Sequence, residues 1–517
     1  MNIHRATHRR RGPVVAAVLL SASLLSTRSS AQEPFPGLDA YITKAMADWK
    51  VPGLGVAIVR NDSVLYTKGY GVLKAGAAIP VDDRTLFEIG SSSKSFTATL
   101  VAMLVTDGKM RWDDRITAWL PGFRLYDPVA SAEVTLRDAL SHRSGLTRGE
   151  LTWMAAGISR EEVLRRVRFL KPSWPFRSRW GYQNMMFLAA GEAAAKAAGT
   201  TWDDLIAQRI FTPLGMTASI PVLREPAKVA NLATPHFVSR DTVRSKQHMN
   251  IDDMAPAGSI VSNARDMAQY LRLQLGDGQF EGKRLVGRAP LRETHTPQML
   301  TGGGAGNDSL TRFNAYGMGW FVEDYRQALV WQHGGNTDGM TTAMGMLPER
   351  KFGVVVLSNM HGSPLPGILM RYLFDRQLGA PMRDLSAEAL ARSVTQRRRA
   401  DSAEQAQAAQ RIVGAKPPAP LSAYAGTYVD SLYGEAVVTL EGERLSMRRG
   451  EWTAPLEFWN GSNFRWGTLP SAAVTSLFVR FDPTPDGKIS SLMFALGADT
   501  AFFNRKPTPA PRAAATP

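Results

Sequence analysis

The sequence contains no cysteine, and this absence excludes several classes of protein. Without cysteine there is no disulfide, no thiolate metal ligand, no iron–sulfur cluster and no thiol nucleophile. A lipoprotein anchor is also excluded, because it requires a lipidated cysteine. Of the 517 residues, 44% are hydrophobic and 21% charged, which excludes collagen, coiled coil and wholesale disorder. This length exceeds what one hydrophobic core can organise and predicts two or three domains.

Long apolar runs are scarce, and the longest clear run lies near the N-terminus. The run 14–25 follows four arginines and precedes the small residues Ser29, Ser30 and Ala31. This pattern is typical of a secretory signal peptide, here residues 1–31, and the run is too short to span a bilayer well. We therefore expect a periplasmic or secreted protein with no stable membrane insertion after cleavage. An uncleaved anchor is the alternative, and the choice between Sec and twin-arginine export is open.

Acidic residues are fewer than basic ones, at 46 against 61, which gives a net charge of +15. Five of the arginines belong to 1–31, which holds no acidic residue. The triplet Arg397–Arg399 lies in a stretch rich in Ala, Gln, Glu and Arg, without the interleaved aromatic residues that single-strand nucleic-acid binding uses. The basic excess therefore predicts a signal peptide and a solvated helix face, and no nucleic-acid partner.

Composition and patterning divide the rest of the chain into four parts. Residues 35–380 predict a mixed α/β segment, with strands first, helices in the middle and strands again near 320–358. Residues 381–420 predict an exposed helix followed by a stiff Pro-rich linker. Short alternating runs in 421–506 predict a small all-β domain, and 507–517 is a Pro/Ala-rich tail that we expect to be disordered.

A serine and a lysine three residues apart, Ser91 and Lys94, open an amphipathic helical pattern. A serine hydroxyl is a weak nucleophile that needs a base within hydrogen-bond reach. On the first turn of a helix, both side chains would point the same way. Burial and the positive field of the helix N-terminus would favour a neutral lysine near pH 7. By itself this spacing is a weak signal, because it also occurs by chance.

Two further patterns contain polar residues suited to a site. Tyr182 and Asn184 stand between a Trp/Pro/Arg-rich loop and a helix, where a phenol can move a proton and an amide can hold a substrate. His333 precedes Gly334 and Gly335, which suggest close backbone approach or an unusual φ. Taken singly, the tyrosine and the histidine are each better explained by a structural role in the core.

Together the three patterns resemble the serine β-lactamase-like superfamily, in its class C, penicillin-binding esterase and D-aminopeptidase branch. The order and spacing of Ser91-x-x-Lys94, Tyr182-x-Asn184 and His333-x-Gly335 carry the resemblance over about 35–380. Five flanking blocks agree in order: 87–98, 140–146, 213–216, 256–259 and 316–320. Residues 424–428 with 433–434 resemble the lipocalin-like barrel appended to some of these hydrolases.

The resemblance implies an α+β fold, in which an antiparallel sheet flanked by helices packs against a helical subdomain, with a small all-β barrel after it. It implies that Ser91 forms the acyl-enzyme and that Lys94 and Tyr182 move protons, with the general base left open between them. Asn184 and Gly335 would border the substrate. The backbone N–H groups of Ser91 and Asn336 would form the oxyanion hole.

One departure from the family pattern affects the expected substrate. β-Lactamases carry Lys-Thr/Ser-Gly as a third motif, and here His333-Gly334-Gly335 stands in its place. A histidine is only partly charged at neutral pH, so it supplies no fixed cation for a substrate carboxylate. The sequence therefore favours a serine hydrolase of small esters or of peptides and amides, including those with D-residues. The alternatives are a β-lactamase, and a penicillin-binding or sensing module that acylates without turnover.

No cofactor or metal is expected, since the proposed acyl chemistry needs neither and the eight histidines are scattered. The expected partner is a small-molecule ester, amide or peptide substrate. The sequence leaves open whether the C-terminal domain gates the cleft, adds substrate contacts, forms an oligomer or only stabilises the chain.

Overall fold

The computed structural model describes residues 35–239, 241–302, 310–467, 469, 471, 476–497 and 499–507. The predicted signal peptide, 1–31, and nearly all of the predicted tail, 507–517, lie outside these residues. Within the part of the chain that is described, no helix has both the length and the apolar character needed to cross a membrane.

An eight-stranded antiparallel sheet forms the centre of the larger, N-terminal part of the molecule. The first strand of the sheet in sequence, in the N-terminal hairpin, pairs directly with the last strand of the sheet in sequence. In spatial order the strands are β2 (Ser63–Gly71), β1 (Gly53–Arg60), β14 (Phe352–Ser358), β13 (Thr341–Leu347), β12 (Ala328–Asn336), β11 (Phe321–Tyr325), β10 (Thr311–Tyr316) and β9 (Met299–Leu300).

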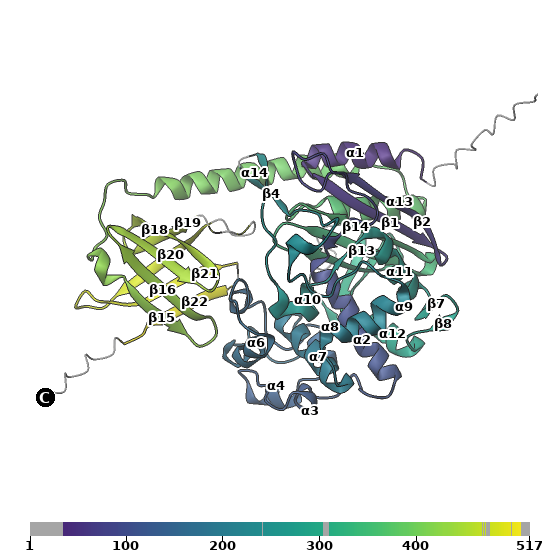
Figure 1. Cartoon of the computed structure of the whole chain (residues 1–517), viewed down its shortest axis with the longest axis horizontal. Helices are drawn as coiled ribbons and strands as arrows, with labels where there is room; N and C mark the ends of the chain where they lie inside the picture. The colour runs from purple at the N-terminus through teal and green to yellow at the C-terminus, as the bar shows by residue number, and fades with distance from the viewer. Residues whose placement is uncertain are drawn as a thin grey trace, which may run out of the picture.

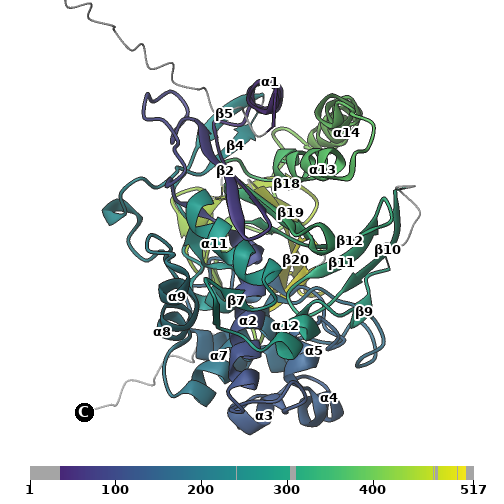
Figure 2. The same cartoon turned by 90° about the vertical axis from the view of Figure 1, so that its right-hand side faces the viewer.

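The central strands are apolar throughout because helices cover both faces of the sheet. On β14, Val354 and Val356 belong to one hydrophobic cluster, while Val355 and Leu357 belong to the cluster on the opposite face. Figure 2 shows the helices of the two faces on either side of the sheet. One face is covered by α1 (Leu38–Trp49) and α13 (Leu365–Leu378), and the other by α2 (Ser93–Thr106) and α11 (Ala264–Leu275).

Local sequence explains the hairpin that starts the sheet. Asn61 and Asp62 connect β1 to β2 and have φ values of 50° and 64°. Two consecutive left-handed residues form the tight turn whose twist matches that of paired strands, and Asn and Asp tolerate this conformation better than most residues. This dipeptide therefore accounts for the tight turn between the two strands.

A helical subdomain packs beside the sheet around α2 and α7 (Asn184–Ala198). Its other helices are α3 (Ile116–Trp119), α4 (Pro128–Glu133), α5 (Leu136–Leu140), α6 (Arg160–Arg166), α8 (Trp202–Ile206), α9 (Thr212–Leu214), α10 (Ala255–Gly258) and α12 (Arg288–Thr294). Three small strand pairs complete this part: β3 (Phe87–Glu88) with β6 (Val261–Ser262), β4 (His236–Ser239) with β5 (Thr242–Ser245), and β7 (Gln279–Phe280) with β8 (Lys283–Arg284).

The C-terminal part is a closed eight-stranded antiparallel barrel, reached through the long helix α14 (Leu385–Ala409). Figure 1 shows α14 passing above both parts and the barrel beside α6. The exposed arginines 397–399 lie on α14. The barrel strands are β15 (Gly426–Asp430), β16 (Gly434–Glu441), β17 (Arg444–Arg449), β18 (Trp452–Asn460), β19 (Asn463–Gly467), β20 (Ser476–Pro483), β21 (Ile489–Leu496) and β22 (Asp499–Arg505).

This architecture confirms the predicted fold class, a flanked antiparallel sheet with a helical subdomain followed by a small all-β barrel. The barrel is not an independent domain joined to the rest only by a linker. One cluster of buried side chains runs from the helical subdomain into the barrel, and it includes Leu151 and Ala155 on one side and Tyr433 and Trp452 on the other. The two parts are therefore packed against each other.

Candidate active site

The start of α2 brings Ser91 and Lys94 together. Ser91 lies on the short helix η1 (Gly90–Ser92), which runs directly into α2, so Lys94 follows one turn later on the same side. The Lys94 Nζ donates to Ser91 Oγ at 3.0 Å and to the backbone carbonyl of Ala257 at 2.7 Å. A hydroxyl and an amine at this distance can exchange a proton.

The environment of Lys94 lowers the proton affinity of its side-chain amine. The side chain is fully buried, and this burial lowers the pKa of Lys94 to about 7. The guanidinium of Arg148 acts in the same direction, while the carboxylate of Glu150 opposes it. Near neutral pH a large fraction of this lysine is therefore a neutral amine that can accept a proton.

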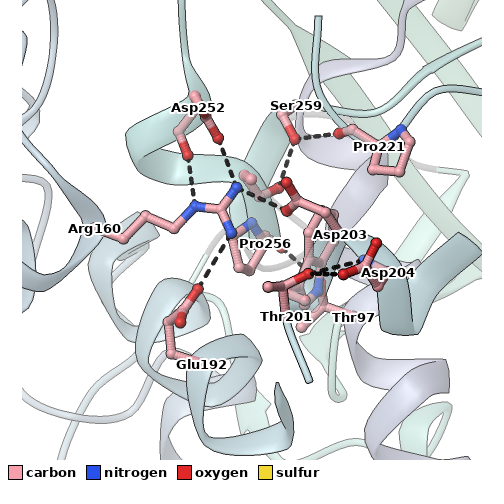
Figure 3. A network of polar contacts seen from close by, with 12 residues as sticks. Thr97, Arg160, Glu192, Thr201, Asp203, Asp204, Pro221, Asp252, Pro256 and Ser259 are labelled. Atoms are coloured by element: carbon pink, nitrogen blue, oxygen red, sulfur yellow. Dashed lines mark hydrogen bonds and ion pairs between the residues drawn. The ribbon is translucent and has the colours of Figure 1, made fainter. Parts of the chain in front are cut away.

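A polar network fixes the segment that carries the Ala257 carbonyl (Figure 3). Arg160 donates to both the side chain and the backbone carbonyl of Asp252, at 2.6 and 2.8 Å. The Thr97 hydroxyl donates to the carbonyl of Pro256 at 2.7 Å. Because the residues before Ala257 are held in this way, its carbonyl stays in place to accept from Lys94.

Tyr182 lies beside both Ser91 and Lys94, and Lys94 Nζ lies 4.9 Å from the centre of its ring. Burial raises the pKa of Tyr182 well above its usual value, although the Ser91 side chain and the nearby Arg148 act in the opposite direction. The phenol is therefore protonated at neutral pH and can donate. Behind it, the ring of His142 lies 4.4 Å from that of Tyr182.

Asn184, the first residue of α7, points its amide group at Glu150. Its Nδ2 lies 3.1 and 3.2 Å from the two carboxylate oxygens. Its Oδ1 is buried and has no hydrogen-bond partner among the described residues. A buried amide oxygen without a partner is costly, so this atom is available to an N–H group of a substrate.

His333 is buried on β12 and makes two contacts within the protein. Its Nε2 lies 2.9 Å from the hydroxyl of Tyr316, and its Nδ1 lies 2.6 Å from the carbonyl oxygen of Gly334. Burial lowers the pKa of His333 to about 3, and Lys94 adds to this effect. The histidine is therefore neutral at physiological pH and provides no fixed positive charge.

Two glycines allow the end of β12 to approach η1. A Cβ on Gly335 would lie 1.8 Å from the carbonyl oxygen of Ile89, and a Cβ on Gly90 would lie 2.7 Å from the backbone nitrogen of Asn336. Gly90 also has a φ of 53°, which favours glycine. This close approach places the backbone of Asn336 next to that of Ser91, and two such N–H groups can hold an oxyanion.

These residues border a cavity of about 470 Å³. Its lining includes Ser91, Tyr182, Asn184, His333 and Asn336, so five of the seven predicted site residues face one space. Lys94 and Gly335 lie behind it and support Ser91 and Asn336. The lining also contains a group of apolar side chains, Trp153, Met154, Met249, Ile251, Met254 and Phe321.

Many of the cavity residues were not predicted from the sequence, among them Arg148, Glu150 and Ser471. Arg148 and Glu150 follow directly after the 140–146 block, and this adjacency was the signal that could have found them. Ser471 belongs to the loop between β19 and β20 of the barrel and also lines the cavity. Nothing in the sequence places a barrel residue more than 370 positions downstream of Ser91 at the same site.

Comparisons with known proteins agree with this geometry. The sequence model of the family described as Beta-lactamase matches residues 38–375, and a domain of unknown function, DUF3471, matches residues 410–508. The Unguisins hydrolase ungD of Aspergillus violaceofuscus is 26% identical over 367 residues, which cover 66% of this chain and 65% of that protein. Penicillin-binding protein 4 of Amycolatopsis lactamdurans is 28% identical over 320 residues, covering 60% of this chain and 81% of that one.

Among solved structures, the octameric penicillin-binding protein homologue from Pyrococcus abyssi superposes with a TM-score of 0.59 at 21% identity. The superposition covers 90% of this chain and 99% of that one, so both the sheet domain and the barrel have counterparts. At this identity the likeness establishes the fold.

Proposed function

The chain belongs to the beta-lactamase family, and we propose that it is an exported serine hydrolase that forms an acyl-enzyme through Ser91. The observation that carries the proposal is the contact between Ser91 Oγ and a buried Lys94 whose pKa is about 7, at the edge of a cavity. The proposed substrates are small esters, or peptides and amides, including those with D-residues. The relatives named a hydrolase and a penicillin-binding protein support chemistry at a serine.

In the proposed reaction, neutral Lys94 removes the proton of Ser91 as Oγ attacks the substrate carbonyl carbon. The carbonyl oxygen then becomes an oxyanion held by the N–H groups of Ser91 and Asn336. The structure favours Lys94 over Tyr182 as the base, because burial raises the pKa of the tyrosine and lowers that of the lysine.

Tyr182 is then suited to donate a proton to the leaving group as the tetrahedral intermediate collapses. Its side chain lies beside Ser91, so the leaving atom departs within its reach. The protonated Lys94, whose Nζ lies 4.9 Å from the centre of the Tyr182 ring, then passes the Ser91 proton to Tyr182, so both groups return to their starting states. The products of this step are the Ser91 acyl-enzyme and an alcohol or amine. Water releases the acid in a second step and regenerates the Ser91 hydroxyl.

The walls of the cavity support the proposed substrate class. The apolar side chains that line the cavity suit a hydrophobic acyl group. Asn184 offers an unpartnered amide oxygen to a substrate N–H. Neutral His333 lacks the fixed charge with which a lysine would attract a substrate carboxylate, which favours esters and amides over β-lactams.

The first prediction tests the nucleophile. Ser91→Ala should abolish turnover of p-nitrophenyl butyrate and of D-amino-acid anilides, because no other hydroxyl would occupy the position of Ser91 Oγ, 3.0 Å from Lys94 Nζ. Ser93→Ala is the matched control, since that side chain accepts from the backbone of Ile260 instead, and it should retain turnover. Full activity of the Ser91 variant would refute the proposal.

The relative named Penicillin-binding protein 4 favours a second candidate, a module that β-lactams acylate without turnover. Stable labelling by a fluorescent penicillin without release would identify this function. Rapid turnover of a chromogenic cephalosporin at low micromolar concentration would identify a β-lactamase instead. A panel of esters, D- and L-amino-acid amides and β-lactams separates these outcomes from the proposed hydrolase.

Export and oligomerisation stay predictions. Sequencing the N-terminus of the protein recovered outside the cytoplasm should give Gln32 as the first residue, after cleavage at the predicted site. Light scattering on residues 32–517 measures whether the barrel joins chains into an oligomer.

A further inference from the structure

Residues of the barrel bind backbone groups at both ends of one loop of the active site. We call residues 148–155 the 148–155 loop; it contains the short helix η2 (Glu150–Thr152). At the start of β22, the carboxylate of Asp499 accepts from the backbone N–H of Gly149 at 2.9 Å and from that of Leu151 at 3.2 Å. These N–H groups belong to the first turn of η2, where no intrahelical partner exists, so Asp499 caps the helix from another domain.

Arg449, the last residue of β17, holds the other end of the same loop. Its guanidinium donates to the carbonyls of Leu151 and Met154. The side chains of Arg449 and Asp499 are buried, with 1% and 6% of the residue surface exposed. A buried guanidinium and a buried carboxylate that bind backbone groups of this loop restrict it strongly, because leaving either unpaired would be costly.

The turn after β17 adds a third contact. The N–H of Glu451 donates to the carbonyl of Ala155 at 2.8 Å. A Cβ on Gly450 would lie only 2.0 Å from that same oxygen, and Gly450 has a φ of 55°. Only a glycine allows the turn to press so closely on the loop.

The loop held in this way carries part of the cavity wall. Arg148, Glu150, Trp153 and Met154 all line the cavity beside Ser91. Both carboxylate oxygens of Glu150 face Nδ2 of Asn184, so the position of the loop sets the orientation of this amide. A continuous set of contacts thus runs from Asp499 through η2 and Glu150 to Asn184.

From this set of contacts we propose that Asp499 and Arg449 are positioning residues of the active site, and that the barrel acts by orienting Asn184 through the 148–155 loop. The inference rests on the proposed function, in which Asn184 receives the amide of a substrate. It assigns the barrel a role in selecting substrates that carry an N–H group near the scissile bond. Small esters without such a group depend less on it.

Kinetics with two substrates test this role. In Asp499→Ala, kcat/KM for an N-acetyl-amino-acid p-nitrophenyl ester should fall about 10- to 100-fold, since a misplacement of about 1 Å costs this much. For p-nitrophenyl butyrate, which has no amide, the fall should be less than about threefold. Asp486→Ala is the matched control on the β20–β21 turn, where the carboxylate contacts only Thr484 and Lys488 among the described residues, and neither substrate should be affected. Equal losses for both substrates would overturn the proposal.

A double-mutant cycle separates positioning from general stability. If Asp499 acts through Asn184, the two effects on kcat/KM for the N-acetyl-amino-acid ester should not be additive. Adding Asp499→Ala to Asn184→Ala should then lower kcat/KM by less than about twofold. Full additivity of the two losses would overturn the proposal, since a barrel that only stabilises the fold would give that result.

Hydrogen exchange tests the contacts between the barrel and the 148–155 loop independently of enzyme activity. The amides of Gly149 and Leu151 should be protected in the wild-type chain and exchange at least tenfold faster in Asp499→Ala. Gly450→Ala should have a similar effect by pushing the turn away from Ala155, without a change of charge. Unchanged exchange in both variants would overturn the proposal. If the wild-type chain hydrolyses no substrate, the proposed function is refuted. The hydrogen-exchange result would then still decide whether Asp499 holds the 148–155 loop.

Discussion

At the scale of single residues, burial controls the chemistry more than neighbouring charges do. Desolvation is the largest influence on the pKa of Lys94, Tyr182 and His333. It disfavours the charged form of each group, so it lowers the pKa of the lysine and histidine and raises that of the tyrosine. As a result, Tyr182 and His333 are neutral at pH 7, and Lys94 is about half neutral and can exchange a proton.

The pH profile should therefore report Lys94. Below its pKa of about 7 the amine is protonated and cannot accept the Ser91 proton, so kcat/KM should fall about tenfold per pH unit there and level off above it. The measurement is kcat/KM for p-nitrophenyl butyrate from pH 5 to 9. A flat profile down to pH 5 would exclude Lys94 as the base.

His333 should behave differently in the same assay. Because its pKa is about 3, it stays neutral across pH 5 to 9, so His333→Gln should change the rate without moving the acidic limb of the profile. The variant keeps a polar group beside the Tyr316 hydroxyl. A limb displaced by one pH unit or more in this variant would mean that His333 titrates during turnover.

At the scale of elements, the site depends on how η1 meets the end of β12. The Ser92 hydroxyl donates to the carbonyl of His333 at 3.2 Å, and Gly335 lies directly against Ile89. The strand and the short helix are thereby joined through backbone contacts. The two N–H groups of the proposed oxyanion hole come from these two elements.

Gly335→Ala should separate the two elements. Its Cβ would overlap the carbonyl of Ile89, and relief of the overlap should cost about 1–3 kcal/mol of stability. Gly334→Ala is the stability control, because its Cβ would meet only the carbonyl of Thr342, at 3.3 Å. Urea unfolding measures both, and activity of the Gly335 variant should fall at least about 100-fold with the loss of an oxyanion donor. Equal stability of the two variants would contradict the close approach.

At the scale of the whole molecule, direct contacts hold the barrel in place. Arg449 and Asp499 bind the helical subdomain through its backbone, and the buried cluster is continuous between the two parts. The connector after α14 is exposed, with 57% and 88% of the surfaces of Ile412 and Val413 open to solvent. The covalent link thus contributes much less to the arrangement than the interface does.

Lengthening the connector should consequently have little effect. Insertion of six Gly/Ser residues after Lys416 should change kcat/KM by less than about twofold, because a flexible insertion in the connector has only a small entropic cost. The Asp499→Ala variant, which keeps the connector and loses an interface contact, is the contrasting case. A large loss of activity on insertion would show that the connector itself sets the position of the barrel.

The fold class and the central residues of the site could be predicted from the sequence alone. Ser91 and Lys94 share one helical turn, so their meeting follows from local geometry. The Asn61-Asp62 turn and the alternating barrel strands are likewise local patterns, which depend on residues close in sequence. Short-range periodicity and turn chemistry are sufficient for such features.

The fold was needed to establish the burial that shifts the pKa values of Lys94 and His333, and to show how the two domains contact each other. The pKa of Lys94 depends on packing from every side, and no spacing in the sequence encodes it. Likewise, Asp499 reaches the amide of Gly149 across 350 residues of chain. Burial and long-range capping arise when distant segments exclude water together, so they exist only in the folded molecule.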